Sequence, residues 1–326
     1  MYVGNLVGLI CAVHSGGMGD FMAYQLEDIN VAVRQDASGY MQRCDREFAD
    51  KVGAAAQLIC GRMGDSPVVL LSGPSGSGKT TTAGMICREL ERRGVGSHTI
   101  SMDDYFVHQD PRTAPRTPEG EIDYESPQVM DLALLNEHFS RLTRGEEIVI
   151  PKFEFARQMR NDSAGVPLKL GRDEIAIFEG IHALNPQITG SHPEATRLYI
   201  SARSSVLDGA ALRFKGTWMR LTRRAVRDYN FRGTDVMGTL GMWDNVRRGE
   251  KLYISPYKHT AHLLFDSSLP YEVSVMACYA RPLMEAVPED NQRTQELREL
   301  VAAFDWFETI DPKLVPAGSL LHEFIG

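Results

Sequence analysis

A glycine-rich stretch at residues 73–80 constrains this chain more than any other part of its sequence. It reads Gly73-Pro74-Ser75-Gly76-Ser77-Gly78-Lys79-Thr80. The spacing is that of a P-loop, G-x-x-x-x-G-K-[ST], and the motif lies after an apolar run at 68–71 and before a helical pattern that begins at Lys79. A chance glycine-serine turn is the alternative, and the two flanking elements argue against it. We therefore predict a buried strand, a phosphate-binding loop and a helix in succession.

The residue types of this loop suit phosphate binding. Its glycines let successive backbone N–H groups face inward as an anion nest at a helix N-terminus. Lys79 then reaches the β- and γ-phosphates, and Thr80 offers its hydroxyl to Mg²⁺.

Strand-like and helical runs alternate along the rest of the chain. We expect strands at 98–101, 175–178, 197–200 and 262–265, and helices at 79–93, 127–144, within 218–248 and within 271–307. This alternation predicts an α/β fold, a doubly wound parallel sheet with a helical lid. Phe48, Val52 and Ile59 recur at helical spacing, so residues 1–66 are expected to form a helical N-terminal extension to a P-loop domain at 67–326 that ends in helices.

Charge and composition restrict the partners. The formal net charge of −8 does not attract polyanions, so nucleic acid is not expected to bind. The five cysteines lack any metal-binding spacing, which suggests a reducing cytoplasm. No signal peptide and no window of about 18 apolar residues is evident, so we expect a cytoplasmic protein without a membrane partner. The sequence leaves a homo-oligomer open.

Two of the expected strands end in acidic residues. Asp103 and Asp104 follow the strand at 98–101, and Glu179 follows the strand at 175–178. Ligands of open α/β sheets bind at this carboxyl edge. One aspartate can accept the proton of a reacting hydroxyl or, alternatively, cap the next turn. Glu179 can hold Mg²⁺ or a water bound to it.

A basic stripe marks the helix expected after residue 218. Arg220, Arg223, Arg224 and Arg227 share one helix face, and Arg232 follows. Such a stripe is either a solvated face or a lid that clamps phosphates, and beside a P-loop we favour the lid. A GTPase is not indicated, because the D-x-x-G match at 162–165 follows no strand and no N-K-x-D motif is present.

From residue 68 to its end the chain resembles the uridine kinase and phosphoribulokinase family of P-loop kinases. Within that family it is most similar to bacterial uridine kinase-like nucleoside kinases, although their TGS module is not evident here. Besides the P-loop with Thr81, the matching stretches are residues 100–106, 122–127, 151–155, 178–186, 223–228, 268–272, 315–321 and 323–326.

The resemblance implies transfer of a phosphoryl group from ATP to a hydroxyl, with Mg²⁺. The catalytic residues would be Asp103 as base, Lys79 and Arg227. ATP would be bound by Gly73, Ser75, Gly76, Ser77, Gly78, Lys79, Thr80, Thr81, Arg224 and Arg232. Mg²⁺ would be bound by Thr80 and Glu179. The acceptor would meet Asp123 at its sugar hydroxyls and the aromatic wall of Phe153 and Phe155.

Three departures from the family pattern concern the acceptor. Gln158 stands where uridine-cytidine kinases place a base-reading histidine, and it can either pair with a base edge or point to solvent. Phe153 replaces a tyrosine, and Ala261-His262 replaces Ala-Asp. We expect a nucleoside kinase that makes a 5′-monophosphate. The alternatives are a kinase of another small hydroxyl metabolite, such as a sugar phosphate or a pantothenate-like acid, and a non-catalytic ATP-binding regulator.

Overall fold

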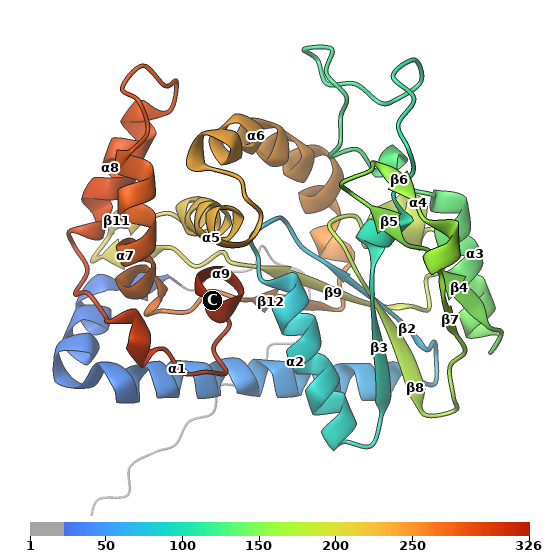
Figure 1. Cartoon of the computed structure of the whole chain (residues 1–326). Helices are drawn as coiled ribbons and strands as arrows, with labels where there is room; N and C mark the ends of the chain where they lie inside the picture. Colours follow the sequence, from blue (N-terminus) through green and yellow to red (C-terminus); the bar gives the residue numbers. More distant parts are fainter. Residues whose placement is uncertain (1–22) are drawn as a thin grey trace, which may run out of the picture.

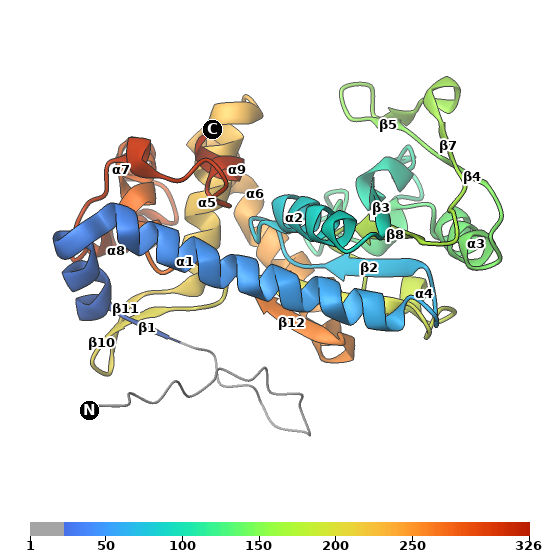
Figure 2. The same cartoon turned by 90° about the horizontal axis from the view of Figure 1, so that it is seen from below.

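The computed structural model describes residues 23–326. The first part of the predicted N-terminal extension, residues 1–22, lies outside the described residues. The described part begins with the short strand β1 (Tyr24–Gln25) and the long helix α1 (Leu26–Arg62), which changes direction at Asp36 (φ −162°, ψ 84°). Figure 2 shows that α1 runs beside α2 (Lys79–Arg92) along one face of the central sheet.

The central sheet has five parallel strands in the order β12-β9-β2-β8-β3. Their bounds are β2 (Val68–Ser72), β3 (Gly96–Ser101), β8 (Glu174–Glu179), β9 (Thr196–Ser201) and β12 (Leu263–Asp266). The predicted α/β fold is therefore confirmed. The bounds of each predicted strand differ from the observed ones by at most two residues at either end. The P-loop, Asp103 and Glu179 lie at the carboxyl ends of β2, β3 and β8. These three parallel strands end at the same edge of the sheet (Figure 1).

Alternating residues of β2 enter two different apolar clusters. Val69 and Leu71 pack with α1 and α2, whereas Val68 and Leu70 pack with α3 (Leu132–Thr143) and α4 (Pro186–Thr189). Since successive side chains of a strand point to opposite faces, the sheet is covered by helices on both sides. The helix α1 shares the larger of the two cores with the sheet.

The chain from residue 216 onward is mainly helical. It contains α5 (Gly216–Phe231), α6 (Val236–Gly249), α7 (Glu272–Glu285), α8 (Thr294–Phe304) and the short α9 (His322–Ile325). The helices expected within 218–248 and within 271–307 are thus confirmed as two pairs. Among residues 23–326, no helix has both the length and the apolar character needed to cross a bilayer.

Several short elements differ from the prediction. The helix expected at 127–144 begins as a 3₁₀ turn (Pro127–Val129), and α3 starts only after Asp131, whose carboxylate accepts a hydrogen bond from Leu134 N (3.0 Å) as an N-cap. β1 pairs with β10 (Val206–Asp208), which forms a hairpin with β11 (Ala211–Phe214). Two further small sheets join β4 (Ile148–Ile150) to β7 (Val166–Leu168) and β5 (Phe153–Glu154) to β6 (Met159–Arg160).

Candidate active site

The carbonyl groups of the P-loop are held from outside the loop. Three successive carbonyl oxygens accept hydrogen bonds: Ser75 O from Arg220 Nη1 (3.3 Å), Gly76 O from Arg223 Nη1 (3.4 Å) and Ser77 O from Ser267 Oγ (2.6 Å). The donors come from α5 and from the loop that follows β12. Because these carbonyls point outward, the loop amides are left to face a bound anion.

At two positions of the loop, close contacts leave no space for a side chain, so glycine is required there. A Cβ atom on Gly73 would lie 1.9 Å from Ile200 O, and one on Gly76 would lie 2.9 Å from Arg220 O. Gly76 also has a positive φ of 74°, a conformation that favours glycine. The glycine spacing recognised in the sequence is therefore explained by packing of the loop on β9 and α5.

Lys79 and Thr80 begin α2 and face the carboxylates of the sheet edge. Thr80 Oγ1 donates to Glu179 Oε1 at 3.2 Å, and Lys79 Nζ donates to Pro74 O at 3.3 Å. Loss of solvation lowers the pKa of the Lys79 ammonium. The negative charges that oppose this fall are those of Glu179, Asp103 and Glu323.

The two acids predicted at strand ends lie near Lys79. Burial raises the pKa of the Glu179 carboxyl, and the positive charge of Lys79 opposes that rise. Asp103 is exposed to solvent, yet the surrounding protein raises the pKa of its carboxyl through desolvation, against the charges of Lys79 and Arg232. Its neighbour Asp104 instead pairs with Lys152 Nζ at 2.9 Å. Of the two aspartates, Asp103 is therefore the one that acts electrostatically on Lys79.

The three predicted lid arginines meet at one buried carboxylate, Asp228. Its oxygens lie 3.2 Å from Arg224 Nε, 3.3 Å from Arg227 Nη2 and 3.6 Å from Arg232 Nη1. Arg224 Nη1 also donates to Ser75 Oγ at 2.8 Å. Asp228 thus gathers three guanidinium groups, and one of them reaches the P-loop directly.

The other half of the basic stripe is neither a lid nor a solvated face. Arg220 and Arg223 are almost completely buried, where they pair with Glu250 and Glu272. The expectation that all four arginines serve a lid is corrected by this finding. The reason is that α5 packs on the P-loop, so its inner positions need buried counter-charges and loop carbonyls as partners.

The residues predicted for the acceptor lie at two places. Asp123 is buried, and its carboxylate is engaged by Arg248 Nη2 (2.6 Å) and by the Tyr253 hydroxyl (3.0 Å). Phe153 and Phe155 on the β5–β6 hairpin have ring centroids 5.0 Å apart. Both also contact Phe106, at 5.8 and 5.7 Å, just beyond the 3₁₀ turn that carries Asp103.

Gln158 lies in the turn of this hairpin and is exposed. Its φ of 53° is in the left-handed region, and its side-chain Nε2 donates to Phe155 O at 2.9 Å. The amide is thus engaged in its own turn. His262 lies just before β12, at the amino edge of the sheet, where its Nδ1 accepts from Arg197 N at 3.0 Å. That departure from the family pattern is therefore at the opposite edge from the P-loop.

The sequence analysis did not single out Glu125 or His182. Burial raises the pKa of Glu125 to about 7, and Arg224 opposes this rise while Asp123 adds to it. Burial lowers the pKa of His182 to about 4, and its ring meets that of Tyr253 edge-on at 6.2 Å. An acidic residue two positions after Asp123 was the only sequence signal for Glu125.

The chain is similar to known proteins of one kinase family. Residues 68–193 match the model of the phosphoribulokinase / uridine kinase family. Residues 68–193 therefore resemble this family. The chain is 29% identical over 174 residues to a uridine kinase of Schizosaccharomyces pombe, a match that covers 53% of this chain and 34% of that enzyme. It is 24% identical over 209 residues to a uridine kinase of Staphylococcus aureus, covering 64% of this chain and 91% of that enzyme.

Among solved structures, one described as a possible uridine kinase from Bacillus stearothermophilus is similar with 16% identity and a TM-score of 0.44. The similarity covers 68% of this chain and all of the other. The chain spans about one third of the first of the two curated relatives and most of the second. The resemblance to this kinase family that the sequence analysis stated is confirmed.

Proposed function

We propose that this kinase transfers the γ-phosphoryl group of ATP to a hydroxyl of a small molecule, and that the acceptor is a nucleoside converted to its 5′-monophosphate. The observation that carries the proposal is the convergence of Lys79, Thr80, Asp103 and Glu179 at one edge of the sheet. Phosphoryl transfer depends mainly on positioning and charge stabilisation, which these groups can supply.

The P-loop amides, Lys79, Thr81 and Arg224 would bind the phosphates of ATP. Thr80 and Glu179 would hold Mg²⁺, and they fit it because a hydroxyl and a carboxylate oxygen lie 3.2 Å apart beside the loop. Within residues 23–326 no cluster of three or more His, Cys, Asp or Glu side chains could hold a metal ion by itself. Mg²⁺ takes few protein ligands and arrives with substrate phosphates. Bound there, the ion would neutralise charge on the β- and γ-phosphate oxygens.

Asp103 would accept the proton of the attacking hydroxyl. It is accessible to solvent and near the charge of Lys79, so a hydroxyl can approach both it and the γ-phosphate. The rise in its pKa makes the carboxylate a somewhat stronger base. Arg227 and Arg232 would stabilise charge on the transferred group.

The acceptor side supports a nucleoside. The cluster of Phe106, Phe153 and Phe155 offers the apolar ring faces on which a base can stack. Asp123 is already engaged by Arg248 and Tyr253, so it would order the pocket, while Glu125, which the charges of Lys79 and Arg224 influence, would meet the sugar hydroxyls. We further propose a reducing, cytoplasmic location, since the four cysteines within the described residues are all free.

A panel of acceptors tests the proposal. Uridine, cytidine, purine nucleosides, sugar phosphates and pantothenate are each incubated with MgATP, and acceptor-dependent ADP release is measured, with Lys79→Ala as the blank. We expect a pyrimidine nucleoside to give the highest kcat/KM. Faster turnover of a sugar phosphate or pantothenate would replace the nucleoside by another hydroxyl metabolite. ATP binding without turnover of any acceptor would identify a regulator.

A further inference from the structure

The last residues of the chain, which we call the C-terminal segment (residues 319–326), pack directly on the P-loop. The methyl groups of Leu320 lie 2.9 and 3.2 Å from the position that a Cβ atom on Gly78 would take. Phe324 is completely buried, with its ring 5.0 Å from the guanidinium carbon of Arg223, and its carbonyl accepts from Asn230 Nδ2 at 3.1 Å. The short helix α9 of this segment therefore lies against α5 (Figure 1).

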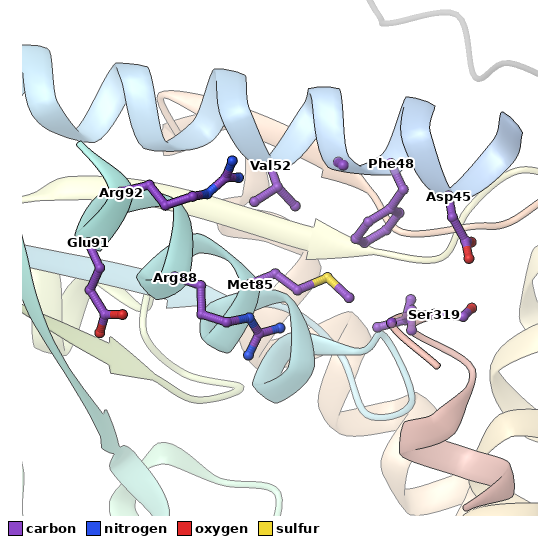
Figure 3. A pocket seen from close by; sticks show the side chains of 11 residues that line it. Asp45, Phe48, Val52, Met85, Arg88, Glu91, Arg92 and Ser319 are labelled. Carbon is purple, nitrogen blue, oxygen red and sulfur yellow. The ribbon is translucent and has the colours of Figure 1, made fainter. Parts of the chain in front are cut away.

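Two further elements hold the beginning of this segment. Ser319 Oγ is 2.7 Å from the Tyr271 hydroxyl, which donates to Asp45 Oδ1 at 2.7 Å. Figure 3 places Asp45 of α1 and Ser319 at the same end of the pocket between α1 and α2. The segment is thus fixed at Ser319 and again at Phe324, so the residues between them have little freedom.

Glu323 lies between these two fixed points and projects a carboxylate toward the arginines of α5. Its Oε1 is 3.8 Å from Arg227 Nη1, and its side chain is only 15% exposed. Its Oε2 is buried and has no hydrogen-bond partner within residues 23–326. A buried carboxylate oxygen without a hydrogen-bond partner is costly. The position therefore points to a role in the site.

The contacts of Arg227 indicate what that role is. On one side its Nη2 approaches Asp228, which Arg224 and Arg232 also approach. On the other side its Nη1 lies 3.8 Å from Glu323 Oε1. A long arginine side chain has many rotamers, and a carboxylate on each side of the guanidinium selects one of them.

We propose that Glu323 is a positioning residue that holds Arg227 toward the γ-phosphoryl group of bound ATP. This inference rests on the proposed function, because it takes Arg227 to contact the transferred group. It also makes residues 319–326 part of the nucleotide site. Glu323 itself would touch neither phosphate nor acceptor, since a carboxylate next to phosphate oxygens is repelled by them.

A double-mutant cycle tests the proposal. Arg227→Ala, Glu323→Gln and the double variant are compared in kcat and in the Kd values of ADP and of an ATP analogue with an imido β–γ bridge, with thermal unfolding measured for each. We expect kcat to fall about 100-fold in Arg227→Ala and about 10-fold in Glu323→Gln. The double variant should lose no more than Arg227→Ala alone, because both changes remove the same interaction.

The two nucleotides separate positioning from general damage to the site. Glu323→Gln should raise the Kd of the analogue, which has a γ-phosphate, while the Kd of ADP changes less than about threefold. Glu323→Asp keeps the charge and should recover part of the loss; it also replaces the glutamine variant in the cycle if that variant does not fold. Glu308→Gln, which breaks the pair of Glu308 with Arg34 (2.9 Å), is the matched control and should change none of these values.

Two results would overturn the proposal. One is a loss of about 1000-fold in the double variant, the product of the single losses, which would make the two residues independent. The other is an equal loss of affinity for ADP and for the analogue in Glu323→Gln. A third result separates this proposal from the proposed function. If no acceptor is phosphorylated, but the effects of Arg227→Ala and Glu323→Gln on the Kd of the analogue are not additive, the proposed function fails while the role of Glu323 stands.

Discussion

Arg223 and Glu272 form an ion pair that is completely closed to solvent behind the P-loop. Arg223 Nη2 lies 2.6 Å from Glu272 Oε2, and both side chains have no exposed surface. The same guanidinium also donates to Ser267 O at 2.9 Å and to Gly76 O at 3.4 Å. The pair therefore links α5, α7 and the phosphate-binding loop through one set of hydrogen bonds.

Breaking this pair is expected to destabilise the protein strongly. Glu272→Gln leaves the buried guanidinium without a counter-charge, and we expect the free energy of unfolding to fall by about 3–5 kcal/mol. Urea unfolding followed by circular dichroism measures the change. The matched control Glu308→Gln removes a half-exposed partner of Arg34 and should cost less than about 1 kcal/mol. Equal losses in the two variants would show that the buried pair contributes no more than a surface pair.

The burial of Arg223 in this pair could not be predicted from the sequence. The spacing of Arg220, Arg223, Arg224 and Arg227 correctly places them on one helix, but spacing alone does not say which side of the helix meets the core. Burial of Arg223 depends on Glu272, which is 49 residues later in the chain. By contrast, β2 and β8 are predictable because each is a local apolar run bounded by turn residues.

The small sheets were missed for a similar reason. β1 has only two residues and is a strand because Tyr24 and Gln25 pair with Val206 and Leu207. No local sequence pattern predicts the pairing of β1 with β10. At the site, the P-loop, Asp103 and Glu179 are predictable because they lie at the ends of predicted strands. The positions of Glu125 and Glu323 near Lys79 instead depend on packing between segments that are far apart in the sequence.

Stability should depend on pH through Glu125. Burial raises the pKa of its carboxyl from 4.5 to about 7 in the folded state. The folded protein therefore favours the protonated form, and the stability this gives is complete below about pH 4.5 and is lost as the pH rises through 7. Glu125→Gln has no proton to lose. Relative to the parent, it should gain roughly 1–3 kcal/mol in the free energy of unfolding between pH 4.5 and 8.

Urea unfolding at pH 5, 6, 7 and 8 measures this difference. Glu121→Gln, at an exposed position of the same loop, is the matched control, and its profile should stay parallel to that of the parent. A Glu125→Gln profile that is also parallel would mean that Glu125 titrates as it does in the unfolded chain.

Lys79→Ala and Asp103→Asn should affect ATP affinity and kcat in different ways. Loss of Lys79 removes a positive charge from the phosphates, so both ATP affinity and kcat should fall. Asp103→Asn should leave the Kd of ATP nearly unchanged and lower kcat by roughly 10²- to 10⁴-fold, as expected for a lost general base. Asp104→Asn is the matched control: because Asp104 pairs with Lys152, its loss should lower kcat only slightly. A larger effect of Asp104→Asn than of Asp103→Asn would exchange the two assignments.

The last prediction concerns Gln158, whose side chain the structure engages in the β5–β6 turn. Its Nε2 donates to Phe155 O at 2.9 Å, and its backbone has a φ of 53°. We expect Gln158→Ala to change kcat/KM by the same factor for uridine, cytidine and a sugar phosphate, because it perturbs the hairpin that carries Phe155 and not a contact with one acceptor. Gln158→Gly tolerates the positive φ and separates the loss of the side chain from backbone strain.

A base-reading role for Gln158 would give a different result. In that case Gln158→Ala and Gln158→Gly would both cost about 1–3 kcal/mol in kcat/KM for the two nucleosides, since a buried base edge would lose its partner. The sugar phosphate, which has no such edge, would be unaffected. Steady-state kinetics of the two variants with all three acceptors therefore decides whether the glutamine serves the turn or the base, because only a contact with the base can make the loss depend on the acceptor.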